Sequence, residues 1–317
     1  MGYLEIILIL CGLYVGWNIG ANDAANCVGT SVGAGLITQK IGSLLVGLIA
    51  LIGATLQGAE PIKTVGKGIL LSNLPLVLII ISLFSAAFLV TCFTLFGLPV
   101  STTQAVIGAI AGIGIVTISK LDWNVFFKIF FFNFGSFLIS LIFSFFLYYA
   151  TSKTFKKGKF LFIEKRIRYL TIMSAMFLAY SLGANNIGNA MGLVVANVNI
   201  KPVLAGFIGG VALAIGCSTL GIKVIKTVGK DIVPLDATMA FSAQTGSALI
   251  IYILALFGIP TSTTFAIVGG IAGTGLVKGV AAIKKSTLKR IFFAWIFTPI
   301  FSAILTIMLY LFFEFIT

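Results

Sequence analysis

Three short blocks of sequence occur twice along the chain, in the same order and at almost the same spacing. The two copies of each block lie 163, 163 and 161 positions apart. Such regularity predicts two homologous halves. The pairs are GANDAAN (20–26) with GANNIGN (183–189), IKTVGK (62–67) with an identical copy (225–230), and GLPVSTT (97–103) with GIPTSTT (258–264).

The segments around these blocks are strongly apolar. Only 9% of the 317 residues are charged and the mean hydropathy is +1.16, whereas soluble domains carry about 25% charged residues. A soluble fold could not bury this much apolar surface, so the composition excludes a soluble enzyme, a nucleic-acid-binding protein and a disordered chain. The net charge of +13 comes from short basic runs between apolar segments, where it indicates membrane topology.

Several apolar stretches are shorter than the roughly 20 residues that a membrane-crossing helix needs. Gly- and Pro-interrupted sequence lies between them, which favours broken or re-entrant helices. We therefore predict an all-α polytopic membrane protein of roughly 10–12 membrane segments, with residues 1–150 as one transmembrane repeat, 151–168 as a basic cytoplasmic loop and 169–317 as the second repeat. The expected spans are 4–19, 42–57, 74–96, 123–150, 169–182, 203–221, 238–257 and 291–313.

Charges around equivalent segments predict that the two halves are inverted. The loop 151–168 is strongly basic and should be cytoplasmic. Segment 117–122, before the last span of the first half, has one Lys and one Asp, whereas its counterpart 278–290 carries several Lys and an Arg. Equivalent positions then face opposite sides, and both termini lie outside. Glu5 stands where a signal peptide would be basic, so we expect the first apolar stretch to be a mature helix.

The block 20–26 places a carboxylate deep in the apolar chain, at a cost of about 2.5–3.5 kcal/mol on insertion scales. Asp23 and Asn26 are three residues apart and would share one helix face, with Asn22 beside them. Their oxygens suit a hard cation such as Na⁺. Gly20 and Ala21 would let the backbone unwind and offer carbonyls. The alternative is an ordinary capped helix end at the membrane surface.

The blocks beginning at Gly97 and Gly258 each place Pro before a Ser/Thr run and a small, apolar run. This order is typical of a helix N-terminus, which offers unpaired N–H groups to a phosphate-like anion. Two such ends facing each other would cradle one tetrahedral oxyanion, whereas the alternative is plain capping with tight packing. The candidate hydroxyls are those of Ser101, Thr102, Thr103, Ser262, Thr263 and Thr264.

Together these motifs resemble the inorganic phosphate transporter (PiT) family of sodium- or proton-coupled symporters, across nearly the whole chain. The resemblance implies an inverted-repeat fold that imports phosphate by alternating access with a coupling cation. It also implies that the phosphate site contains the six hydroxyl residues with Asn22 and Asn185, and that the Na⁺ sites contain Asp23, Asn26 and Asn189. To these we add Gln104, whose carbonyl could accept a hydrogen bond from protonated phosphate, and Asn186 and Gln244 as further Na⁺ ligands.

The chain departs from the family pattern at two positions. The family usually has Asp where this chain has Asn186, and often Glu where it has Gln244. Neutral oxygens still suit Na⁺ but carry protons poorly, and the chain has no His, so Na⁺ coupling is favoured over H⁺. Asp23 leaves H⁺ coupling open, and sulfate has nearly the shape of phosphate.

Two other function classes are alternatives to a symporter. An anion channel could use the same helix ends, although Asp23 would oppose anion passage. An intramembrane enzyme would lack a nucleophile and base pair. We therefore expect no enzymatic activity and no cofactor, with phosphate, Na⁺ and the lipid bilayer as partners. A homodimer would be unsurprising for the family, and we expect no disulfide among the four separated Cys.

Overall fold

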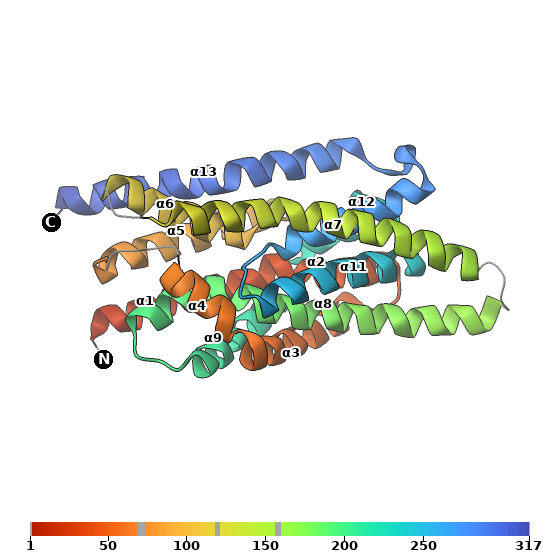
Figure 1. Cartoon of the computed structure of the whole chain (residues 1–317), viewed down its shortest axis with the longest axis horizontal. Helices are drawn as coiled ribbons and strands as arrows, with labels where there is room; N and C mark the ends of the chain where they lie inside the picture. Colours follow the sequence, from red (N-terminus) through yellow and green to blue (C-terminus); the bar gives the residue numbers. More distant parts are fainter. Residues whose placement is uncertain (1, 69–73, 118–120, 156–159, 317) are drawn as a thin grey trace.

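The computed structural model describes residues 2–68, 74–117, 121–155 and 160–316, which form long helices joined by short connections (Figure 1). The helices are α1 (Tyr3–Asn18), the π-turn η1 (Ile19–Asp23), α2 (Ala24–Gly33), α3 (Gln39–Gln57), α4 (Ala59–Gly68), α5 (Leu76–Leu95), α6 (Thr102–Val116), α7 (Trp123–Phe155), α8 (Phe160–Asn197), α9 (Pro202–Cys217), α10 (Ile222–Lys226), the π-turn η2 (Thr227–Asp231), α11 (Ala237–Leu256), α12 (Thr263–Lys278), the 3-10 turn η3 (Val280–Ala282) and α13 (Lys285–Ile316).

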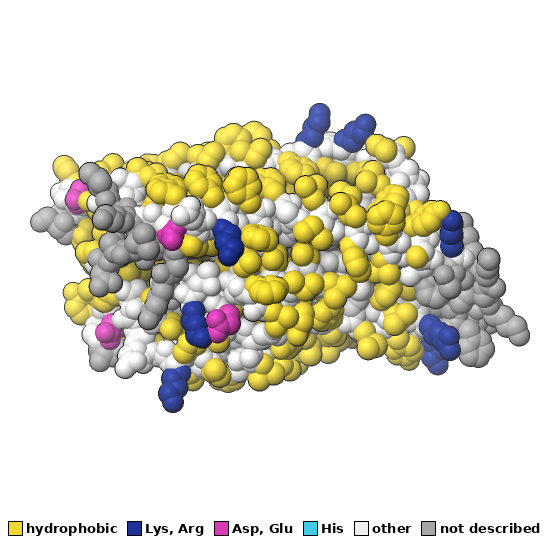
Figure 2. Space-filling model, viewed as in Figure 1, with side chains coloured by type: hydrophobic (Ala, Val, Ile, Leu, Met, Phe, Trp, Pro, Cys, Tyr) yellow, Lys and Arg dark blue, Asp and Glu magenta, His cyan; other side chains and the backbone are white. Residues whose placement is uncertain are grey.

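Within the described residues, seven helical stretches are long and apolar enough to cross a membrane. An eighth is reached if α9 and the α10–η2 segment, bent by 70°, count as one span. The short apolar helices α6 and α12 are the two that follow the Gly-x-Pro blocks. Hydrophobic side chains dominate the face shown in Figure 2, where charged side chains are few. The expected all-α polytopic membrane fold is confirmed.

Equivalent helices of the two halves run in opposite directions. In Figure 1, α7 runs from the left end to the right, whereas α13 starts at the right and reaches the C-terminus at the left. Both termini lie at the left end, and the end of α7 and the start of α8 lie at the right. The inverted arrangement predicted from the charges is therefore present. Which end faces the cytoplasm remains a prediction from the basic residues.

The expected loop over 151–168 is wrong where the structure describes it. Residues 151–155 continue α7 and residues 160–168 belong to α8, while 156–159 lie outside the described residues. Lys, Arg and Glu are good helix formers, so the charged residues Glu164, Lys165, Arg166 and Arg168 are compatible with the helix that the structure shows over 160–168. At about 1.5 Å per residue, helices of 33 and 38 residues exceed a hydrocarbon core about 30 Å thick and extend past it.

The polar block at residues 20–26 does not unwind, contrary to our expectation. A continuous helix runs from Tyr3 to Gly33 and widens only to the π-turn η1, and the second copy lies within α8. The glycines serve close packing instead. A Cβ on Gly20 would lie 2.0 Å from the Leu213 carbonyl oxygen, and one on Gly183 would lie 1.9 Å from that of Ala50.

The two halves interlock through their short helices. Helix α6 packs against α13 of the other half, and α12 packs against α7. Gly108 faces the backbone of Pro299, while Gly269 faces that of Phe137, so small residues allow both close approaches as expected. This exchange brings the N-termini of α6 and α12 together in the interior.

Candidate functional site

Helices α6 and α12 begin in the same way, as the Pro-Ser/Thr pattern predicts. Ser101 has an extended backbone, and its Oγ accepts a hydrogen bond from the Gln104 N–H at 3.2 Å. Ser262 does the same for the Phe265 N–H at 3.4 Å. Each serine is thus the N-cap of its helix, and its hydroxyl oxygen is engaged in capping.

The two helix starts face each other across the boundary between the halves. The Thr103 hydroxyl donates to the Thr261 carbonyl at 3.4 Å, and the Thr264 hydroxyl donates to the Val100 carbonyl at 3.0 Å. These contacts are equivalent under the internal repeat. Two helix N-termini, each with unpaired N–H groups and partial positive charge, therefore meet inside the protein.

Asn22 and Asn185 hold the segments that precede these helices. Each amide nitrogen donates to the carbonyl before the Pro, and each amide oxygen accepts the N–H two residues further on. Both amides are thereby occupied within their own half, so in this conformation they position the helix starts rather than offer free donors. The bonds join Asn22 to Leu98 O (3.0 Å), Val100 N (3.1 Å) and Thr94 Oγ1 (2.8 Å), and Asn185 to Ile259 O (3.0 Å) and Thr261 N (2.8 Å).

Asp23 and Asn186 lie at the centre of this arrangement. Asn186 Nδ2 donates to Asp23 Oδ2 at 2.9 Å. The Thr264 hydroxyl lies 3.2 Å from Asp23 Oδ1 and shares its single hydrogen between this oxygen and the Val100 carbonyl. The Thr263 hydroxyl donates to Asn186 Oδ1 at 3.4 Å, and Thr102 lies beside Asp23 at the equivalent place. The only carboxylate of the site is thus fixed by amide and hydroxyl donors and is 1% exposed.

Asn26 and Asn189 form a second symmetric pair that crosses between the halves. Asn26 Nδ2 donates to Thr264 Oγ1 at 2.8 Å, and Asn189 Nδ2 donates to Thr103 Oγ1 at 2.9 Å. Both amide oxygens are buried and accept no hydrogen bond from any protein group. Leaving such an oxygen unpaired costs about 1–3 kcal/mol, and amide oxygens are ligands that hard cations accept. The described residues contain no cluster of His, Cys, Asp or Glu suited to a transition metal.

Gln104 breaks the symmetry of the two helix starts. Its side chain is fully buried, and both its amide nitrogen and oxygen lack a hydrogen-bond partner. The equivalent residue is Phe265, whose ring stacks on Trp295 with centroids 3.7 Å apart. One half therefore supplies a free amide where the other half is filled by aromatic rings.

Gln244 lies in a separate polar cluster. Its amide oxygen accepts from the Ser174 hydroxyl at 2.7 Å, and its nitrogen donates to Ser31 Oγ at 2.8 Å and to Thr30 Oγ1 at 2.5 Å. It also reaches the carbonyl of Cys27, next to Asn26, at 3.3 Å. Gln244 therefore contacts α2, the helix that carries Asn26, and the structure shows no hydrogen bond between Gln244 and the other residues predicted to bind Na⁺, all of which it describes.

Two residues that no sequence motif indicates, Asn133 and Trp295, support the site from the other half. Asn133 on α7 accepts the Ser262 N–H at 2.6 Å, and Trp295 on α13 donates from Nε1 to the Pro99 carbonyl at 3.1 Å. A lone Asn within the Phe-rich run of 126–146 was the available signal for the first. The hydroxyls around Gln244 gave no signal, because isolated Ser and Thr residues are common in apolar helices.

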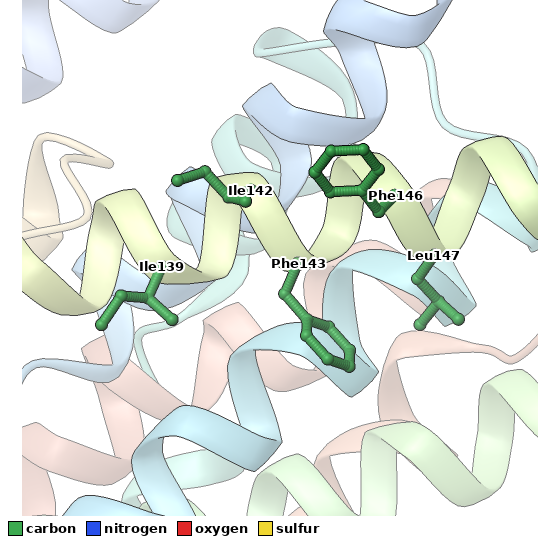
Figure 3. Close-up of a pocket in the computed structure, with 5 residues that line it drawn as sticks. All are labelled: Ile139, Ile142, Phe143, Phe146 and Leu147. Carbon is green, nitrogen blue, oxygen red and sulfur yellow. The ribbon is translucent and has the colours of Figure 1, made fainter.

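The molecule also has an apolar groove. A groove of about 320 Å³ on the outer face of α7 is lined by Ile139, Ile142, Phe143, Phe146 and Leu147, all from that one helix (Figure 3). Phe146 is 62% exposed. This exposed apolar surface is suited to contact with lipid, and its lining residues offer no polar side chain to an ion.

Comparisons with known proteins show the family to which the chain belongs. The model of the phosphate transporter family matches residues 19–163 and 156–306. A protein named "Putative phosphate permease" from Pyrococcus furiosus is 30% identical over 92% of both chains, and one from Haemophilus influenzae is 28% identical over 93% of both. The solved structure titled "The sodium-dependent phosphate transporter" matches the whole of both chains with a TM-score of 0.88 at 24% identity, which shows the shared fold. The chain is therefore a multi-pass membrane protein that belongs to the phosphate transporter family, a family of transporters and not of enzymes.

Proposed function

We propose that this chain imports inorganic phosphate by Na⁺-coupled symport with alternating access. The observation that carries the coupling is the pair of buried, unpaired amide oxygens on Asn26 and Asn189, at equivalent positions in the two halves. Amide oxygens are ligands that hard cations accept, so two such oxygens at equivalent buried positions support a cation site.

The anion site of this proposal lies between the N-termini of α6 and α12. The backbone N–H groups of these first turns and the hydroxyls of Thr102 and Thr263 supply donors without a net charge. Asp23 lies within the same cluster, so a bound phosphate would meet one negative charge. A Na⁺ ion between the carboxylate and the anion would remove that repulsion, which makes the binding of the two ions mutually favourable.

Burial supports alternating access. Each residue assigned above to the phosphate and Na⁺ sites is at most 2% exposed, so ions reach the site only after a conformational change. The inverted halves offer two equivalent ways to open, one toward each side. The cross-half bonds of Thr103 and Thr264 are the contacts that such a motion would rearrange.

Uptake of radiolabelled phosphate into proteoliposomes tests the proposal. An inward Na⁺ gradient should drive uptake, excess sulfate should leave it unchanged, and an inward proton gradient alone should not drive it. Uptake driven only by protons would make Asp23 a proton carrier and refute Na⁺ coupling. Uptake indifferent to both gradients would favour an anion channel. The expected homodimer remains a proposal that the mass of the purified protein would test.

A further inference from the structure

A small polar cavity lies outside the buried site, at the surface where η2 meets the start of α13. Its volume is about 150 Å³, which equals roughly five waters at about 30 Å³ each. The segment after η2 and the start of α13 are joined by a bond from the Lys284 N–H to the Ile232 carbonyl at 3.0 Å. Its lining residues are Leu98, Thr227, Asp231, Lys284, Thr287, Arg290 and Ile291.

The charged side chains of this cavity are not neutralised by each other. The ion pairs among the described residues are Lys63–Glu60 and Lys278–Asp236. Lys284 and Arg290 are exposed and are therefore available to a solute. With Asp231 as the only carboxylate in the lining, the cavity carries one net positive charge, and hydroxyls of Thr227 and Thr287 lie in the same wall.

The cavity adjoins the buried helix start. Leu98, one of its lining residues, offers its carbonyl to Asn22 at 3.0 Å, and the Thr227 hydroxyl donates to the Gly97 carbonyl at 2.8 Å. The turn that leads into α6 thus separates the cavity from the interior. A solute bound in this cavity would be separated from the proposed anion site only by this turn.

The opposite half does not repeat this charge pattern. Gly108 packs on Pro299, and its equivalent Gly269 packs on Phe137. Phe137 and Pro299 are therefore equivalent, so each residue of α7 corresponds to the residue of α13 that lies 162 positions later. Asp122 then stands where the second half has Lys284. Asp122 Oδ1 caps α7 by accepting the N–H of Asn124 at 2.9 Å. Lys128 stands at the position of Arg290, so one positive and one negative charge cancel at the equivalent place, and it would attract an anion less than this cavity does.

We propose that this cavity is a second oxyanion site, in which Lys284 and Arg290 bind a phosphate group at the surface that the basic residues predict to be cytoplasmic. A planar guanidinium beside an ammonium is a frequent phosphate-binding combination. The inference that a phosphate group binds here depends only on the residues of the cavity. The further inference that transported phosphate binds here on its way to or from the buried site rests on the proposed function. A phospholipid headgroup has the same chemistry as free phosphate, since α13 enters the membrane beside the cavity.

Equilibrium binding of radiolabelled phosphate to the purified full chain tests the site. Wild type should bind phosphate without Na⁺, and the Lys284→Gln/Arg290→Gln variant should lose this binding at least about tenfold, as expected for lost charge-assisted contacts. The matched control is Lys285→Gln/Lys289→Gln, which removes two exposed charges of the same helix that do not line the cavity. A thermal melt should show all three proteins folded.

Two further arms separate the possible outcomes. Asp23→Asn should abolish Na⁺-dependent phosphate binding and keep the Na⁺-independent binding, so failure of the symport proposal is distinguishable from failure of this site. In nanodiscs, displacement of phosphate by added phosphatidylglycerol in wild type but not in the double variant would identify a lipid headgroup as the occupant. Equal phosphate and phospholipid binding by wild type and the folded double variant would overturn the proposal.

Discussion

Asp23 and Asn186 occupy equivalent positions in the two repeats and are hydrogen-bonded to each other, Asn186 Nδ2 donating to Asp23 Oδ2 at 2.9 Å. A buried pair of carboxylates at this separation would repel and need a proton or cation between them. An amide facing a carboxylate needs neither. The departure from the family pattern at Asn186 therefore leaves one negative charge at the centre, held by direct contact.

Replacement of Asp23 by Asn should abolish coupling to the cation. The variant keeps the size of the side chain but removes the charge that Na⁺ would neutralise, so Na⁺-driven phosphate uptake into proteoliposomes should fall at least about tenfold. The control is Asp122→Asn, which changes a surface carboxylate to another good N-cap and should leave uptake unchanged. Wild-type uptake with wild-type Na⁺ dependence in Asp23→Asn would contradict the assignment.

The two cross-half threonines should differ in their effect on Na⁺. Thr264 contacts both Asn26 and Asp23, whereas Thr103 contacts Asn189 and a backbone carbonyl but no carboxylate. Thr264→Val should therefore raise the Na⁺ concentration for half-maximal uptake more than Thr103→Val, by about tenfold. Titration of uptake against Na⁺ measures both. The reverse order would place the cation nearer Asn189 than Asn26.

The anion side of the site is tested by Thr102→Val and Thr263→Val. Each removes a hydroxyl at the start of a helix while keeping the side-chain volume, so phosphate affinity should fall more than Na⁺ affinity. Binding of each ion, measured separately by isothermal titration, gives the comparison. Thr306→Val is the control, because Thr306 is buried on α13 and bonds only to the Ser302 carbonyl there. Unchanged phosphate affinity in both variants would remove the helix ends from the anion site.

Much of the architecture could be predicted because the same sequence blocks occur in both halves of the chain. The repeated blocks give two halves, and the unequal charges of 117–122 and 278–290 give their inversion. The helix starts at Ser101 and Ser262 follow from local chemistry, since Pro and a Ser/Thr cap act over only a few residues. These signals depend on neighbours in sequence, which a single chain displays.

Contacts between the halves could not be predicted in the same way. Asn22 looked like a ligand, but its amide is occupied by the turn before α6. Trp295 donates a hydrogen bond to the carbonyl of Pro99, which lies almost 200 positions earlier in the chain. No pattern in either segment indicates that bond. The predicted unwinding at Gly20 failed for a related reason: glycine allows both a broken helix and a close approach, and only the neighbouring Leu213 backbone decides between them.

The close approach of α8 to α3 gives the last prediction. A Cβ on Gly183 would lie 1.9 Å from the Ala50 carbonyl oxygen and 2.7 Å from its carbonyl carbon, and a backbone cannot move aside as a flexible side chain can. Gly183→Ala should destabilise the protein by at least about 1–3 kcal/mol, the usual cost of overpacking, and lower the midpoint of thermal unfolding in detergent.

Gly135 on α7 provides the matched control, because no heavy atom lies within 4 Å of the Cβ that alanine would add there. Gly135→Ala should be neutral or stabilising by about 0.5–1 kcal/mol, since alanine is the better residue within a helix. If Gly183→Ala melted at the wild-type temperature, α3 and α8 would not pack as closely as described, and the site residues that follow Gly183 on α8 would lose the support that this contact provides.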